Sequence, residues 1–183
     1  MRRAWLLLLL FAPAVLFAQS GPLGYFQIAE GRVIWQSVYS TSLNSEDAAR
    51  RLTIEGFRVV DATDSMVTFY CDGLNVAPEE FGYSRGETPM YVTGNNLLFR
   101  GFIQIKDGRY RVTLDRFILM NNITTAGGVF TAGSTSPIES QALNGTDFSS
   151  GFKKIPARIY NQLLYRKFFL FDPEASNYLG SDW

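Results

Sequence analysis

The chain has 183 residues, with 17 basic and 17 acidic side chains and no histidine. This length suits one domain with a sizeable core, and the neutral charge balance gives no electrostatic basis for nucleic-acid binding. The lack of histidine excludes Ser–His and Cys–His catalytic arrangements and histidine metal sites.

The first twenty residues, MRRAWLLLLLFAPAVLFAQS, have the pattern of a secretory signal peptide. Two arginines precede an apolar run that ends at Ala18, and a polar residue follows. The alternative is an uncleaved membrane anchor, against which the shortness of the run and Pro13 argue. We therefore expect cleavage of residues 1–18 and a location in the periplasm or outside the cell. Because no cysteine stands directly after the run, we do not expect a lipoprotein, and we find no later membrane span.

The first regular elements are predicted between residues 32 and 56. The run RVIWQSVYS, residues 32–40, is rich in β-branched and aromatic residues and predicts a strand. A helix should follow from Ser45, whose side chain can cap the first amide groups. The acidic residues Glu46 and Asp47 favour this helix start, and Gly56 is typical of a helix end.

Two further strands, FRVVDAT and SMVTFYC, are predicted around a polar turn at Asp64 and Ser65. The second strand places Cys71, the only cysteine, on the same face as Val67 and Phe69. We expect a small buried apolar residue there, because no histidine is available to activate a thiol. The sequence Asp-Ser-Met around Ser65 also resembles an acceptor pattern for O-linked sugars in some gut and oral bacteria, although an ordinary hairpin turn is the alternative.

Residues 72–96 have no clear periodicity and several prolines and glycines, so we predict a long loop with a short edge strand near Met90–Thr93. A hairpin follows, because Asp107-Gly108 separates two alternating runs and suits a type I′ turn. A two-residue turn fixes the register. On the apolar face, Ile105 then pairs with Tyr110, Ile103 with Val112 and Gly101 with Leu114. On the other face, Lys106 pairs with Arg109, Gln104 with Arg111, Phe102 with Thr113 and Arg100 with Asp115.

The second face of this hairpin is the candidate binding surface. Arginine can form a two-pronged contact with a carboxylate and phenylalanine offers a stacking plane, so the face suits an anionic or sugar-like ligand. The alternative is that these side chains only keep the wet side of an antiparallel sheet soluble. The candidate binding residues are Arg100, Phe102, Gln104, Lys106, Arg109, Arg111 and Thr113.

The remaining chain should contain a long connection and a final helix. Residues 121–151 are rich in glycine, serine, threonine and asparagine, which predicts a long irregular segment. The run from Ile155 has Pro156 in its first turn and apolar residues at helical spacing, which predicts a helix to about residue 171. Gly101, inside a predicted strand, indicates a bulge or the close approach of a helix.

The predicted order is β-α-β-β-β-β-α, which implies an α+β fold with a mostly antiparallel sheet and both helices on one face. The stretches VIWQSVYS and FRGFIQIKDGRYRVTL resemble a family of secreted bacterial proteins described as a domain of unknown function with a TATA-binding-protein-like (TBP-like) fold. The resemblance covers roughly residues 32–120. It implies a TBP-like curved sheet and an exported location, and it supplies no catalytic residues.

These observations favour an exported, non-enzymatic domain without metal or cofactor, which binds an envelope protein or a small ligand through the open sheet face. The alternative is a hydrolase that uses carboxylates of the two long loops, and a deep pocket with two close acids would favour it. The predicted division is a signal peptide at 1–18, a leader at 19–30, one domain at 31–171 and a tail at 172–183.

Overall fold

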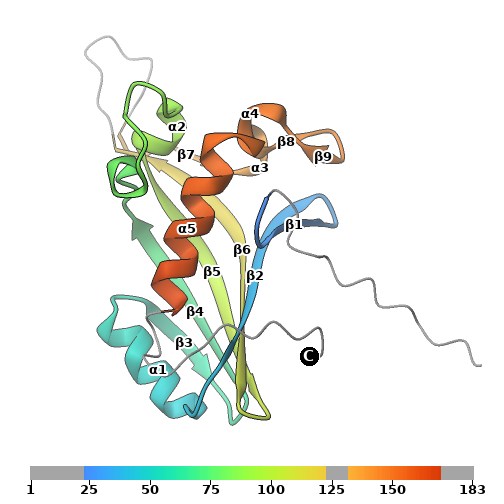
Figure 1. Ribbon diagram of the computed structural model, residues 1–183. Helices are drawn as coiled ribbons and strands as arrows, with labels where there is room; N and C mark the ends of the chain where they lie inside the picture. The colour runs from blue at the N-terminus through green and yellow to red at the C-terminus, as the bar shows by residue number, and fades with distance from the viewer. Residues whose placement is uncertain (1–22, 123–131, 170–183) are drawn as a thin grey trace, which may run out of the picture.

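A computed structural model describes residues 23–122 and 132–169, so the predicted signal peptide and tail lie outside the described residues. The main element is a seven-stranded antiparallel sheet in the order β1-β2-β6-β5-β4-β3, in which β7 pairs with the end of β6 (Figure 1). The strands are β1 (Phe26–Ala29), β2 (Arg32–Ser40), β3 (Arg58–Ala62), β4 (Met66–Leu74), β5 (Asn95–Lys106), β6 (Arg109–Asn121) and β7 (Thr135–Pro137).

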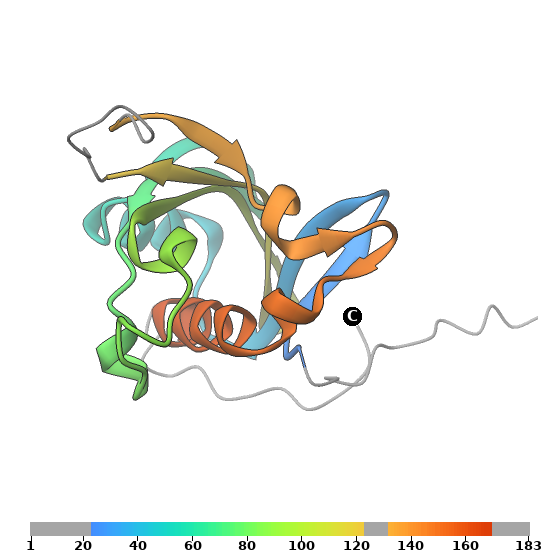
Figure 2. The same cartoon turned by 90° about the horizontal axis from the view of Figure 1, so that it is seen from above.

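Two main helices, α1 (Ser45–Ile54) and α5 (Ile155–Phe169), pack on the same face of the sheet, as predicted. Figure 2 shows the sheet curving around α5. The predicted α+β class is therefore confirmed. The smaller elements are the 3-10 helix η1 (Pro78–Phe81), the helices α2 (Met90–Thr93), α3 (Glu139–Ala142) and α4 (Ser150–Lys153), and the short hairpin of β8 (Leu143–Asn144) and β9 (Asp147–Phe148).

The structure confirms the predicted strand at residues 32–40 and the predicted helix start at Ser45. The residue that caps this helix differs from the prediction. The side chain of Asn44, not that of Ser45, accepts the hydrogen bond from the amide of Asp47, at 2.8 Å. Ser45 is already the first helical residue. Gly56 follows the helix with φ of 85°, a left-handed conformation that favours glycine and ends α1 as predicted.

Two segments expected to be irregular contain regular structure. The predicted leader, residues 19–30, contributes β1, which pairs along its whole length with β2. The predicted edge strand near Met90–Thr93 is wrong, because these residues form α2. Pro89 precedes the helix and accepts from the amide of Val92 at 2.8 Å, which closes a helical turn instead of a strand ladder.

The expected long irregular segment at 121–151 is also partly wrong. Residues 123–131 lie outside the described residues, but residues 132–151 contain β7, α3, β8, β9 and the start of α4. Sparse apolar side chains attach this polar stretch to the core, and each of them is buried. These anchors are Ile138, Ala142 and Phe148, followed by Phe152 in α4.

An aromatic cluster around Phe168 of α5 forms the centre of the core. Its ring lies 5.6 Å from that of Phe57, in a stacked arrangement, and 5.9 Å from that of Phe69. The hydroxyl of Tyr110 on β6 donates to the carbonyl oxygen of Phe168 at 2.7 Å, so the helix is attached to the sheet by a buried hydrogen bond as well. Cys71 is buried at the edge of this core, as predicted, and burial raises the pKa of its thiol.

The predicted β5–β6 register is confirmed at every pair from Arg100↔Asp115 to Lys106↔Arg109. Asp107 and Gly108 have φ of 50° and 71°, as a type I′ turn requires. Gly101 allows a close approach, but the approaching group is the Phe69 ring of the neighbouring strand rather than a helix. The register shift lies nearby, between Leu98 and Arg100.

We predict that Gly101→Ala lowers the free energy of unfolding by about 1–3 kcal/mol, the usual effect of overpacking a core. A Cβ at this position would overlap the Phe69 ring, which the surrounding aromatic cluster holds in place. Gly86→Ala is the matched control, because a Cβ there meets no atom within 4 Å. The measurement is a denaturant titration, and equal stabilities for the two variants would contradict this account of the core.

Candidate functional site

The predicted binding residues of the β5–β6 hairpin lie on the sheet face opposite α1 and α5, which we call the open face. Their neighbours in sequence, such as Ile103 and Val112, are fully buried against the helices. Phe102, Arg111 and Thr113 are instead half-buried, as expected for alternate residues of a strand. The hairpin geometry therefore brings the seven predicted residues to one surface.

Pairing with the flanking strands extends this surface beyond the hairpin. One row across the sheet contains Thr68, Phe102, Thr113 and Gln36. Within it, the amide Nε2 of Gln36 donates to the hydroxyl of Thr113 at 2.9 Å. The neighbouring rows contain Met66, Gln104, Arg111 and Val38 on one side, and Arg58, Tyr70, Arg100 and Asp115 on the other.

Arg100 is held in place by a carboxylate and an aromatic ring. Its guanidinium donates from Nε to Oδ1 of Asp115 at 2.9 Å and makes a second contact with Oδ2, so the predicted cross-strand pair is confirmed. The guanidinium also lies over the Phe102 ring, 4.7 Å from its centroid. The side chains of Arg100 and Asp115 are 23% and 16% exposed, and their hydrogen bond raises the pKa of Arg100.

Arg111 is positioned by an amide rather than by a carboxylate. The side-chain oxygen of Gln104 accepts from its Nε at 3.0 Å and from its Nη2 at 2.6 Å. Burial lowers the pKa of Arg111, although a guanidinium stays protonated at any physiological pH. The two hydrogen bonds to Gln104 therefore orient the guanidinium plane of Arg111.

The structure adds Arg58, which the sequence prediction missed. It forms a two-pronged ion pair with Asp72, at 2.9 and 3.0 Å, and lies 4.9 Å from the Tyr70 ring centroid. The hydrogen bond from Arg58 lowers the pKa of Asp72. The outward alternation of the run MVTFYC could have indicated Tyr70, but the register shift between Val59 and Asp61 in the β3–β4 hairpin hid the pairing of Arg58 with it.

The other predicted positions lie toward the β5–β6 turn. Lys106 is exposed and Arg109 is half-buried. Ser65 is exposed in the neighbouring β3–β4 turn, where its carbonyl oxygen accepts from the amide of Ile105 at 2.8 Å. This hydrogen bond fixes the backbone of the turn. O-glycosylation of Ser65 stays a prediction.

One acid from each of the two long loops forms an ion pair. Glu79 is paired with Arg85 at 2.8 Å and Asp147 with Lys153 at 3.0 Å. The pKa of Glu79 is lowered by its own backbone amide and by Arg85, and the pKa of Asp147 is lowered mainly by the hydrogen bond from Lys153. Neither residue has the raised pKa that a general acid needs.

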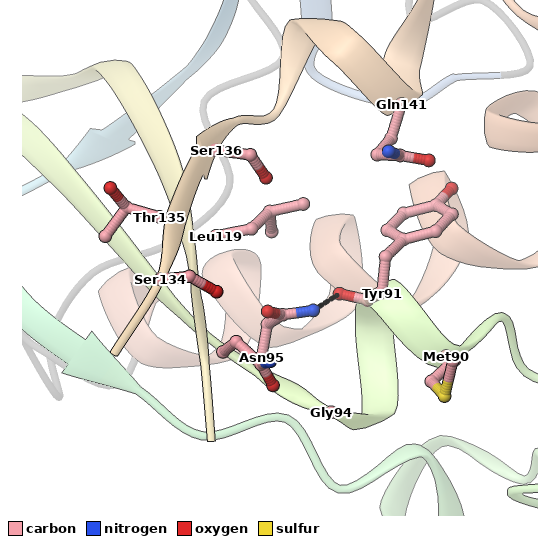
Figure 3. Close-up of a pocket in the computed structure, with 10 residues that line it drawn as sticks. Met90, Tyr91, Gly94, Asn95, Leu119, Ser134, Thr135, Ser136 and Gln141 are labelled. Atoms are coloured by element: carbon pink, nitrogen blue, oxygen red, sulfur yellow. Dashed lines mark hydrogen bonds between the residues drawn. The ribbon is translucent and has the colours of Figure 1, made fainter. Parts of the chain in front are cut away.

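A pocket of about 420 Å³ lies beside α2, at the end of the sheet (Figure 3). None of the described residues that line it is acidic, so it is not the pocket with two close acids that a hydrolase would need. Within residues 23–122 and 132–169, no group of three or more Asp, Glu, Cys or His residues is placed to bind a metal. No helix in the same ranges has the length and apolar character needed to cross a membrane. The lining residues are Met90, Tyr91, Gly94, Asn95, Leu119, Asn121, Ser134, Thr135, Ser136 and Gln141.

We predict that Asp115→Asn lowers the free energy of unfolding by about 1–3 kcal/mol, between the values typical of exposed and buried ion pairs. The matched control is Asp72→Asn, because the Arg58–Asp72 pair has the same two-pronged geometry but side chains that are 57% and 62% exposed. Its effect should be much smaller. Denaturant titrations of both variants are the measurement, and a larger loss for Asp72→Asn would contradict the ranking of the two ion pairs by burial.

Solved structures with the same arrangement show the fold of this chain to be TBP-like. A TBP-like protein from Parabacteroides distasonis superposes with a TM-score of 0.52 at 9% identity, over 82% of this chain and 98% of the other. A DUF4468 family protein from Bacteroides ovatus superposes with a TM-score of 0.50 at 11% identity, over 81% of this chain and 90% of the other. No family model matches the sequence, and no curated protein matches it either.

Proposed function

We propose that this chain is an exported, non-enzymatic domain that binds a protein partner of the bacterial envelope through the open face. The observation that carries the proposal is the pair of guanidiniums, Arg58 and Arg100, held over the rings of Tyr70 and Phe102 on one exposed surface. Neither of the structures with the same fold is named as an enzyme, which is consistent with a binding role.

The composition of the open face supports a protein partner. Its central rows combine arginine, aromatic residues and methionine, the types enriched where proteins bind one another, and they contain one acid, Asp115. Sites for small molecules are usually concave, whereas these rows follow the surface of a sheet. A protein partner can cover several strands at once and contact all three rows.

The hydrogen bonds of the face also favour binding. Ordering a long side chain opposes association, and an arginine that is already held loses less freedom when a partner arrives. Arg100 is held by Asp115 and Arg111 by Gln104, so both guanidinium planes are oriented in the free protein. Phe102 lies between the two pairs in the central strands and provides the apolar contact.

A photo-crosslinker placed at Thr68 tests this proposal in the native host. Thr68 lies beside Phe102 in the central row, and Gln162, exposed on α5, is the matched control position on the other side of the molecule. We expect a discrete protein adduct from position 68 and not from position 162. Adding Arg111→Ala and Phe102→Ala should remove the adduct. The same adducts from both positions, or none from position 68, would contradict the proposal.

Export is tested by the intact mass of the protein recovered from its native host. The basic start and the apolar run before Gln19 support cleavage after Ala18. We expect a mass that corresponds to a chain beginning near Gln19, recovered outside the cytoplasm. A mass that retains residues 1–18 would contradict this part of the proposal, without bearing on the open face.

A further inference from the structure

The pocket beside α2 is formed by three segments attached to the central strands. α2 and Gly94 form one wall, β7 with Ser134 forms another, and α3 contributes Gln141. Figure 3 shows Tyr91 and Gln141 on one side and Ser134 and Ser136 on the other, with Leu119 between them. Its volume of about 420 Å³ lies in the range typical of small-molecule sites, about 300–1,000 Å³.

Backbone hydrogen bonds hold these walls in place. The amide of Asn122 donates to the carbonyl of Gly94 at 2.9 Å, which connects the end of β6 to the end of α2. The amide of Asn121 donates to Ser134 at 2.9 Å, and that of Ile138, before α3, donates to Phe117 at 3.0 Å. The described walls are thus fixed in the free protein, as in most small-molecule sites.

The chemistry of the lining is neutral and hydrogen-bonding. None of the lining residues among the described ranges carries a formal charge. Side-chain amides and hydroxyls line the pocket together with the apolar side chain of Leu119, and Met90, which is 56% exposed, supplies further apolar surface. The polar members are Tyr91, Asn95, Asn121, Ser134, Thr135, Ser136 and Gln141.

The hydroxyl of Tyr91 gives a second, independent indication of a ligand. It is buried, and it has no hydrogen-bond partner among the residues that the structure describes. Burial raises the pKa of Tyr91 to about 12, so the group stays protonated and can donate a hydrogen bond at neutral pH. A buried hydroxyl without a partner is unfavourable in a folded protein, and such groups are uncommon.

We propose that this pocket binds a neutral saccharide unit, with the Tyr91 hydroxyl as one of its hydrogen-bond donors. A ring with several hydroxyl groups can both donate to and accept from amides and hydroxyls, while its C–H surface contacts Leu119 and Met90. An ionised ligand would lose its hydration without gaining an opposite charge from the described lining. The site is distinct from the open face, so either proposal can fail alone.

Saturation-transfer NMR on the full chain tests the proposal, with the methyl glycosides of glucose, galactose, mannose and N-acetylglucosamine as neutral probes. Glucuronate and a short neutral peptide serve as the charged and non-saccharide probes. We expect transfer to at least one neutral glycoside, and weaker or no transfer to the other two. No transfer to any glycoside, or a preference for glucuronate or the peptide, would overturn the proposal.

Variants then locate the binding. Tyr91→Phe should weaken affinity about threefold to tenfold, the loss of one hydrogen bond, while the free protein stays at least as stable because an unpartnered hydroxyl is removed. Tyr39→Phe, in a buried tyrosine of β2 outside the lining, should leave affinity unchanged. Unchanged affinity in Tyr91→Phe, or a destabilised free protein, would contradict the assigned role.

A second variant fills the pocket without altering the core. Ser134 is exposed at the pocket wall, so Ser134→Trp should abolish saccharide binding and keep the thermal stability. Thr146→Trp, in the exposed turn between β8 and β9 and outside the lining, is the matched control and should bind normally. Binding that survives in Ser134→Trp would place the saccharide elsewhere and overturn the proposal.

Discussion

The two-residue turn at Asp107 and Gly108 is the constraint on which the rest of the structure depends. Both residues have positive φ, which sets a type I′ turn and places Lys106 opposite Arg109. β5 and β6 are the longest strands, and the other strands of the sheet build outward from them: β4 pairs with β5, and β2 pairs with β6. A slip by one residue would exchange the buried and exposed faces of the whole hairpin.

This register gives the inward and outward residues of the hairpin different roles. The inward residues include Gly101, whose lack of a side chain admits the Phe69 ring, and Tyr110, whose hydroxyl holds the end of α5. The outward residues form the Arg100–Asp115 and Gln104–Arg111 pairs. Because α1 and α5 both cover the inward face, the open face is the side of the sheet that the two main helices leave uncovered.

Elements with strong local patterns could be predicted from the sequence. The strand at 32–40, the turn at Asp64–Ser65 and the hairpin at Asp107–Gly108 have alternation or turn residues that determine their structure. α2 could not be predicted, because four residues are too few to show a period, and β1 was hidden in a short segment before the first long strand. The buried residues of 132–151 are too widely spaced to indicate any element.

The candidate site was predictable only within the hairpin. Phe102 and Arg111 follow from the turn, but Thr68 lies beside Phe102 through the pairing of strands that are distant in the sequence. Arg58 lies in a predicted hairpin, where an irregular register between Val59 and Asp61 hid its pairing with Tyr70. The pocket depends even more on tertiary structure, since Tyr91 and Gln141 come from two short helices that lie in different connections of the chain. No local pattern could have indicated that they meet.

The most direct test of the hairpin register is the pattern of interstrand backbone NOEs in isotope-labelled protein. The register predicts contacts that join Phe102 to Thr113 and Gln104 to Arg111 across the two central strands. Contacts that instead join Phe102 to Val112 would show a register shifted by one residue. That result would contradict the division into a buried and an open face, because it would turn Val112 toward solvent and bury Arg111 beneath the helices.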